Sequence, residues 1–187
     1  MSDAVRDLGC EPVVVGGLAL AYWSDSTFLT ADIDVVMPRP AELSQRLEAL
    51  GFQRHGREWV LDPHGISFEA PSERLEPGDR PERARLPSGR QLLVLSAEDL
   101  LLWRLREWVH WGAVSGFRQA AHLLVTDVVD PARLDRRADD EGLTLALATL
   151  RSLSSLIEAG QSLQEWELVE AARRIERESY GQEHDTP

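Results

Sequence analysis

The chain has 187 residues, of which 43% are hydrophobic and 28% charged, and its formal net charge is −12 at pH 7. This length suits one globular domain, or one domain with a small helical lobe. The acidic balance argues against general DNA or RNA binding, which needs basic residues to replace the counterions around phosphates. All 20 basic residues are arginine, which excludes Schiff-base lysines and the lysine of a Walker-type phosphate loop.

Several further observations indicate a cytoplasmic protein with no membrane partner. No apolar run approaches the roughly 20 residues that a membrane-spanning helix needs. Residues 1–9 are polar and acidic, unlike the basic start and apolar stretch of a signal peptide. Cys10 is the only cysteine, which excludes an intrachain disulfide and a cysteine-based zinc site.

Short strands and helices alternate in the first half of the chain. A short helix is expected at Ser2–Leu8, followed by a buried strand at 12–15 that leads into Gly16-Gly17 and a helix opening on these glycines. Residues 71–89 are rich in Pro, Gly, Arg and Glu, which predicts an exposed loop. The other elements predicted here are a strand at 32–37, an amphipathic helix at 41–50, a hairpin at 52–62, and strands at 65–70 and 91–95.

The second half is predicted to be helical. Ser96, followed three residues later by Asp99, forms a capping-box pattern that begins a helix. Breaks are expected at Gly112, at Asp130-Pro131 and at Gly160. The remaining residues of this half therefore favour consecutive helices.

This order of elements predicts the fold class and the division of the chain. Mixed strands and helices followed by helices alone indicate an α+β protein. We expect a mixed central sheet flanked by helices in residues 1–96 and a C-terminal helical lobe in residues 97–187. Trp103, Trp108 and Trp111 are expected in the core of this lobe.

Two aspartates in the predicted strand at 32–37 are candidate metal ligands. Side chains two residues apart on a strand point to the same face, so Asp32 and Asp34 lie side by side while Ile33 faces the core. Adjacent carboxylates repel one another unless a cation lies between them, and Mg²⁺ is usually held by one or two carboxylates and substrate phosphates. The alternative for an isolated Asp-x-Asp is a pair of solvated aspartates.

The surrounding sequence adds two features to this pair. The glycines at Gly16-Gly17 allow backbone N–H groups to approach a phosphate at a helix N-terminus, although a strand-to-helix turn without a ligand uses the same pattern. Later in the chain, Ser67 and Glu69 share one face of a predicted strand. Glu69 is therefore a candidate third carboxylate, and otherwise a surface glutamate.

These features together resemble the nucleotidyltransferase superfamily related to DNA polymerase beta. That family combines an apolar strand, Gly-Gly or Gly-Ser, a helix, Asp-x-Asp and a third acid on a later strand. Within it, the sequence is most similar to the AbiEii-like and minimal nucleotidyltransferases of toxin–antitoxin and phage-defence systems. The similarity spans roughly residues 11–145 and includes the segment Leu95–Leu100 and the run Arg118–Ala120.

The resemblance implies roles for individual residues. Asp32, Asp34 and Glu69 would be both catalytic residues and ligands of Mg²⁺ or Mn²⁺. The nucleoside triphosphate would be bound by residues that match the family's phosphate-contacting positions, namely Gly16, Gly17, Thr30 and Arg104. The acceptor would be an RNA 3′ end, a protein side chain or a small molecule, and a cognate toxin or antitoxin protein is a further candidate partner.

The sequence departs from the family pattern at three positions. Many relatives carry Arg-x-Thr-Lys before the Asp-x-Asp, whereas this chain has Phe28 and Ala31 at the two basic positions. Gly17 stands where many relatives have a serine that contacts phosphate. These differences favour an altered or weakened activity.

Arg104 occupies an unusual position on the predicted helix that follows Ser96. On a helical wheel it lies between apolar residues rather than beside Arg106, Glu107 and His110. An arginine in an apolar arc needs an anionic partner. We expect this partner to be the triphosphate or, in the empty protein, one of the three acids; the alternative is a structural ion pair with another carboxylate.

Three functional hypotheses follow. The first is an enzyme that transfers a nucleoside monophosphate from an NTP to a hydroxyl group. The second is a catalytically weak or inactive module that keeps the fold and binds nucleotide. The third is an antitoxin-like protein that acts through an interface.

Overall fold

The computed structural model describes residues 9–181, so the helix expected at Ser2–Leu8 lies outside the described residues. The chain divides into two compact units, and the division falls after Ser96. Among the helices in the described range, none combines the length and the apolar character that crossing a membrane would need.

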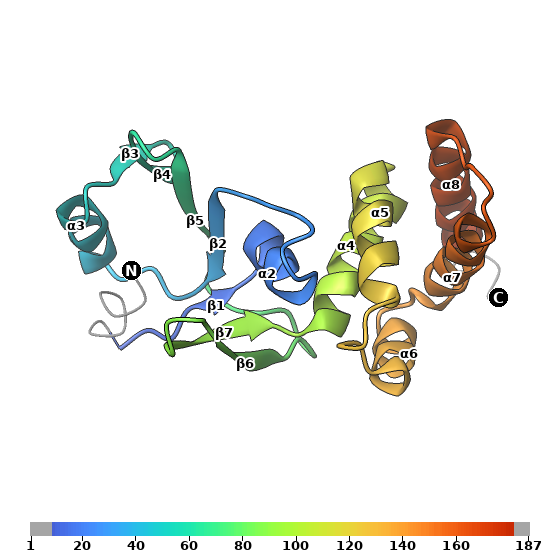
Figure 1. Cartoon of the computed structure of the whole chain (residues 1–187), viewed down its shortest axis with the longest axis horizontal. Helices are drawn as coiled ribbons and strands as arrows, with labels where there is room; N and C mark the ends of the chain where they lie inside the picture. Colours follow the sequence, from blue (N-terminus) through green and yellow to red (C-terminus); the bar gives the residue numbers. More distant parts are fainter. Residues whose placement is uncertain (1–8, 182–187) are drawn as a thin grey trace. The chain divides into compact units, whose positions relative to one another are not determined.

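Seven strands of the described residues form one mixed sheet in the first unit. These strands are β1 (Val13–Val14), β2 (Asp32–Val36), β3 (Gln53–His55), β4 (Glu58–Leu61), β5 (Ile66–Ser72), β6 (Pro81–Arg85) and β7 (Gln91–Leu95). Their order across the sheet is β3-β4-β5-β2-β1-β7-β6 (Figure 1). The pairs β1–β7 and β2–β5 are parallel and the other neighbours are antiparallel, which confirms the predicted α+β class.

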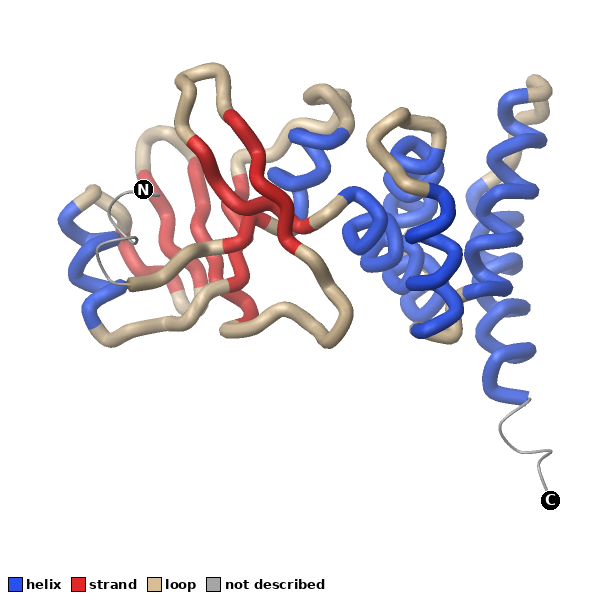
Figure 2. The backbone as a smooth tube through the Cα atoms, turned by 90° about the horizontal axis from the view of Figure 1, so that it is seen from below, coloured by secondary structure: helices blue, strands red, loops and turns tan. Residues whose placement is uncertain are grey.

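Two helices lie on opposite sides of this sheet (Figures 1 and 2). Helix α2 (Gly16–Trp23) begins directly at the glycines, and α3 (Glu42–Ala49) follows β2. The apolar stripe of α3 is buried through Leu43 and Leu47, as its amphipathic pattern predicts. Helix α3 therefore lies on one side of the sheet, and the start of α2 lies on the other (Figures 1 and 2).

The prediction of an exposed loop across 71–89 is wrong in part. Residues Pro81–Arg85 form the edge strand β6, which pairs with β7 along its whole length. Only Ala84 of this strand is buried, so the segment has no apolar alternation from which a strand could be predicted. Its backbone hydrogen bonds to β7 decide its conformation, and charged residues with a proline at the first position are typical of an edge strand.

The second unit is helical throughout its described part. Its helices are α4 (Ala97–Trp111), α5 (Val114–Leu124), α6 (Pro131–Asp140), α7 (Thr144–Glu158) and α8 (Glu165–Gly181). The predicted breaks at Gly112, Asp130-Pro131 and Gly160 fall between these helices, and a further break at Gly142 separates α6 from α7.

A buried ion-pair network joins α4 to α6. Asp99 is fully buried in the first turn of α4 and accepts hydrogen bonds from Arg133 Nη2 at 2.5 Å and from Arg137 Nε at 3.0 Å. Its neighbour Glu98 accepts from Arg133 Nη1 at 2.5 Å and from the backbone N–H of Asp130 at 2.7 Å. The acidic residues after Ser96 therefore hold the helical unit together.

Arg133 remains charged within this network. Burial by itself lowers its pKa, but its hydrogen bonds to Asp99 and Glu98 and their negative charges outweigh burial, so the pKa is raised. A raised folded-state pKa gives a stabilisation that is complete below the unfolded-state value and is lost only above it. Because an arginine is already protonated far above neutral pH, this contribution should stay constant throughout the neutral range.

The tryptophans of α4 divide between core and surface. Trp108 is fully buried against Phe117, with ring centroids 5.0 Å apart, and its indole N–H donates to Leu168 O at 2.9 Å. Trp103 is half-buried. Trp111, which we expected in the core, is 76% exposed because it is the last residue of α4 and precedes the Gly112 break, where the neighbouring helices no longer cover it.

Candidate active site

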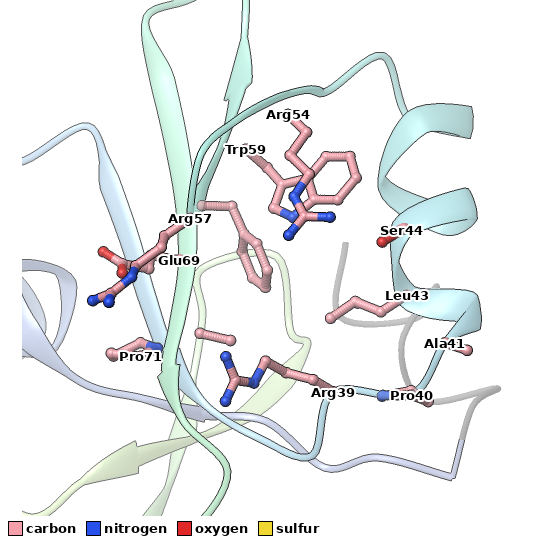
Figure 3. Close-up of a pocket in the computed structure, with 12 residues that line it drawn as sticks. Arg39, Pro40, Ala41, Leu43, Ser44, Arg54, Arg57, Trp59, Glu69 and Pro71 are labelled. Atoms are coloured by element: carbon pink, nitrogen blue, oxygen red, sulfur yellow. The ribbon is translucent and has the colours of Figure 1, made fainter.

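The three predicted acids lie on two neighbouring parallel strands. On β2, Asp32 and Asp34 are two residues apart and share a face. On β5, Ser67 is the register partner of Asp32, and Glu69 is the register partner of Asp34. Register partners project to the same side of a sheet. In Figure 3, Glu69 points away from the side of β5 where Trp59 lies, so the acids occupy the face opposite α3.

Two hydroxyl groups hold the Asp32 carboxylate. Ser67 Oγ donates to Asp32 Oδ1 at 2.5 Å, and Thr30 Oγ1 lies 3.3 Å from Asp32 Oδ2. The backbone N–H of Asp32 in turn donates to Thr30 Oγ1 at 3.0 Å. Ser67 is a site residue that we did not predict, although its position two residues before Glu69 was the available signal.

The glycine turn packs directly against this acidic face. Gly16 has φ +61°, and a Cβ atom at this position would lie 2.2 Å from Asp34 Oδ2. A Cβ atom on Gly17 would lie 3.0 Å from both Cβ and Cγ2 of Thr30. Thr30 therefore fills the space that a serine side chain at position 17 would need, which explains the glycine. The first turn of α2 thus lies beside Asp34, with Val15 N donating to Asp34 O at 2.9 Å.

Replacing Gly16 with alanine should destabilise the first unit through both its backbone and this contact. The positive φ alone costs about 1–2 kcal/mol, and forcing Asp34 aside should add about 1–3 kcal/mol. The matched control is Gly65→Ala, because Gly65 has the same φ of +61° and no atom within 4 Å of an added Cβ. Urea unfolding should show the larger loss for Gly16→Ala, and Asp34→Ala in the same chain should recover the difference. Equal losses in the two glycine variants would contradict the contact.

No family model and no curated protein matches the chain. Among solved structures, an antigenic nucleotidyltransferase-like protein from Paracoccidioides brasiliensis aligns with a TM-score of 0.62 at 16% identity, over 84% of this chain and 87% of that one. The antibiotic-resistance factor ANT(2″)-Ia aligns with a TM-score of 0.51 at 18% identity, over 84% and 91% respectively.

This chain has the nucleotidyltransferase-like fold. At this level of identity the likeness shows the fold alone. The predicted similarity to the AbiEii-like group rests on the sequence motifs, and remains a prediction.

The acidic face of this nucleotidyltransferase-like fold has a donor set that suits a hard cation. Three carboxylates and the hydroxyls of Thr30 and Ser67 are oxygen donors of the kind that Mg²⁺ and Mn²⁺ prefer. Within residues 9–181, no three His, Cys, Asp or Glu side chains lie together as a ready-made metal site. Because Mg²⁺ is commonly held by one or two carboxylates with water and substrate phosphates, the residues fit a metal that arrives with a triphosphate.

Arg104 has an acidic partner on its own helix. Its Nη1 lies 2.6 Å from Glu107 Oε1, one turn further along α4, which is a structural ion pair of the kind that the sequence left open as the alternative; its contact with the triphosphate or with the three acids stays a prediction. The side chain is 14% exposed, and its Nε is buried without a hydrogen-bond partner in the described structure. The ion pair forms because residues three apart on a helix are neighbours, although the wheel places them on different arcs.

Proposed function

We propose that this protein is a metal-dependent nucleotidyltransferase, which moves a nucleoside monophosphate from an NTP to a hydroxyl acceptor. The observation that carries this proposal is the common face of Asp32, Asp34 and Glu69, with the glycine turn packed against it. Three carboxylates suit a divalent metal ion, and backbone N–H groups at a helix N-terminus suit the phosphates of a triphosphate bound with that metal. The nucleotidyltransferase-like fold is consistent with this chemistry.

In the proposed reaction, a bond forms between the acceptor oxygen and the α-phosphorus of the NTP. The bond from that phosphorus to the bridging oxygen breaks, and pyrophosphate leaves. Glu69 accepts the proton of the acceptor hydroxyl, which makes it the general base. Ser67 and Thr30 position Asp32 through their hydroxyl groups.

Asp32 and Asp34 are the proposed ligands of Mg²⁺ or Mn²⁺, and Glu69 completes the set. When bound, such metal ions neutralise the charge that develops on the attacking and leaving oxygens. The backbone at Gly16 and Gly17 is proposed to contact the phosphates, since neither glycine has a side chain to block their approach.

The acceptor and the biological setting extend this proposal. By the sequence resemblance, the acceptor is an RNA 3′ end, a protein side chain or a small molecule, and the setting is a toxin–antitoxin system with a cognate partner protein. By the same resemblance, the proposed location is the cytoplasm. These points rest on sequence motifs.

The test is transfer of label from each of the four α-labelled NTPs, with Mg²⁺, to RNA or protein of a cell lysate. Transfer should occur with the wild-type chain and should be lost in Asp32→Asn. The control variant Glu48→Gln removes an exposed carboxylate of α3, which lies on the other side of the sheet, and it should retain transfer. Absence of label with every NTP would contradict the enzymatic proposal.

The second candidate is a catalytically inactive or weak module that binds nucleotide or acts as an antitoxin-like partner. The absence of basic side chains at Phe28 and Ala31 favours it, because cations near the phosphates contribute to transition-state stabilisation. Calorimetric binding of an NTP with Mg²⁺, without any transfer, would support the module that binds nucleotide. If the chain shows no NTP binding and no transfer, the result would favour the antitoxin-like partner.

Replacing Arg104 with methionine tests its proposed contact with the triphosphate. For that contact, the guanidinium must exchange Glu107 for phosphate, and methionine keeps much of the packing volume. NTP affinity should fall by about 1.5–3 kcal/mol, the scale of a hydrogen bond to a charged group. Calorimetry with Arg151→Met as the control, which breaks only the exposed pair with Asp135, should separate this effect from a general loss of charge. Unchanged affinity in Arg104→Met would leave Arg104 a purely structural role.

A further inference from the structure

A second feature of the first unit is an arginine-lined pocket on β5. The pocket has a volume of about 540 Å³ and is bordered by α3, β4 and β5. Three arginines from separate segments line it: Arg39 after β2, Arg54 on β3 and Arg57 in the β3–β4 turn (Figure 3). Its apolar wall includes Trp59 and Phe68, which are buried.

The charge of this pocket is opposite to that of the protein. Glu69 is the one acidic residue among the residues that line it, against three arginines. The lining is therefore net positive by two charges, in a chain whose formal net charge is −12. Positive charge gathered at one concave place in an acidic protein favours an anionic ligand there.

These arginines are only weakly engaged with the protein itself. Arg39 Nε lies 3.5 Å from Glu73 Oε1, and both side chains are more than half exposed, so this pair contributes little. Arg54 Nε donates to Gly56 O at 3.2 Å and its guanidinium stands 5.9 Å from the Trp59 ring centroid. Arg57 forms no ion pair with any residue in the described part of the chain. Several guanidinium N–H donors thus remain for a ligand.

The pocket extends to Glu69 because β4 is shorter than its neighbour. The pairing of β4 with β5 runs from Leu61↔Ile66 to Trp59↔Phe68, whereas β5 continues to Ser72. The edge of β5 from Glu69 onward is therefore not covered by the β4 ladder. In Figure 3, Arg54 and Arg39 lie on the α3 side of β5, while Arg57 extends on the same side as Glu69.

We propose that this pocket binds a phosphate group of the acceptor, and that the bound acceptor presents its hydroxyl to Glu69. The inference rests on the proposed function, and it narrows the acceptor to a phosphate-bearing molecule. A guanidinium offers paired N–H donors that match phosphate oxygens, and the pocket has such groups on both sides of β5: Arg39 and Arg54 on the α3 side and Arg57 on the side of Glu69 (Figure 3). A polycationic acceptor would be repelled by the same residues. The phosphate belongs either to an RNA chain or to a small phosphorylated molecule.

Direct binding measured without NTP tests the pocket independently of catalysis. The probes are a single-stranded RNA octamer, ribose 5-phosphate and, as a polycation, spermidine, each titrated into the full chain by calorimetry. The single variants Arg54→Gln and Arg57→Gln should each lower the affinity for a phosphate-bearing probe about 10-fold, and the double variant should lower it about 100-fold. The matched control is Arg46→Gln, an exposed arginine of α3 outside the pocket lining. Thermal melting should confirm that these surface variants remain folded.

The outcomes separate the two sources of phosphate. If the double variant loses affinity for the octamer alone, the result would support an RNA acceptor. If it loses affinity for ribose 5-phosphate, the result would support a small phosphorylated acceptor. Unchanged affinity for both probes in the double variant, or losses no larger than those of Arg46→Gln, would overturn the proposal. Spermidine binding more tightly than either phosphate-bearing probe would overturn it as well.

Two further measurements distinguish this proposal from failure of the proposed function. If the double variant has a lower affinity for Mg²⁺–NTP but an unchanged affinity for both phosphate-bearing probes, the arginines bind the nucleotide, and the proposal of an acceptor pocket is overturned. If the probes bind through the arginines but no NTP supports transfer, the pocket stands and the enzymatic proposal fails. If transfer proceeds normally in the double variant, with an unchanged KM for the acceptor, the enzymatic proposal stands and the pocket is overturned.

Discussion

Replacing Asp34 with asparagine is expected to reduce the rate of nucleotidyl transfer by about 10³-fold or more. This is the usual loss of rate when one group that stabilises the transition state is removed. Asp34 is the acid that packs against the glycine turn, since its Oδ2 would lie 2.2 Å from a Cβ atom added at Gly16. An asparagine has the same shape but no negative charge to hold a divalent cation. The fold should survive, because Asp34, in the middle of β2, is only half-buried.

The measurement is single-turnover transfer from labelled NTP, with unfolding curves recorded for the same protein samples. Glu48→Gln again serves as the control for the loss of one carboxylate. Activity within 10-fold of wild type in Asp34→Asn would show that the catalytic metal, if the protein uses one, is held elsewhere. A large loss of both stability and activity would instead give Asp34 a structural role at the glycine turn.

Replacing Asp99 with asparagine is expected to destabilise the helical unit by about 3–5 kcal/mol, the usual result of removing one partner from a buried charge network. Asp99 is fully buried and is the shared acceptor of Arg133 and Arg137. Without its charge, two largely buried guanidinium groups lose a common partner, and each keeps one other carboxylate: Glu98 for Arg133 and Glu141 for Arg137.

Chemical unfolding followed by circular dichroism measures this loss. The control is Asp135→Asn, which breaks the exposed pair between Asp135 and Arg151, with side chains 56% and 41% exposed. An exposed pair contributes about 0–1 kcal/mol, so the two variants should differ several-fold. A similar small effect in both would mean that the α4–α6 network is relaxed by water or by rearrangement. The loss in Asp99→Asn should be the same at pH 7 and pH 9, because an arginine stays protonated at both pH values.

The sequence alone was sufficient for features that depend on local periodicity and backbone chemistry. The common face of Asp32 and Asp34 follows from the two-residue period of a strand. The helix that begins at Gly16 and the helix breaks at Gly112 and Gly160 follow from the conformational freedom of glycine. The buried stripe of α3 follows from its helical spacing. These features are local, so neighbouring residues determine them.

The tertiary structure alone decided which distant segments meet. Glu69 lies beside Asp34 because β5 pairs in parallel with β2 in one particular register, and a shift of one residue would have turned it to the other face. Gly17 is explained only by the approach of Thr30, and Pro81–Arg85 became a strand only by pairing with β7. Arg104 met Glu107 because long side chains bridge positions that a helical wheel separates. Register, close approach and side-chain reach are properties of the packed chain, which local sequence patterns do not encode.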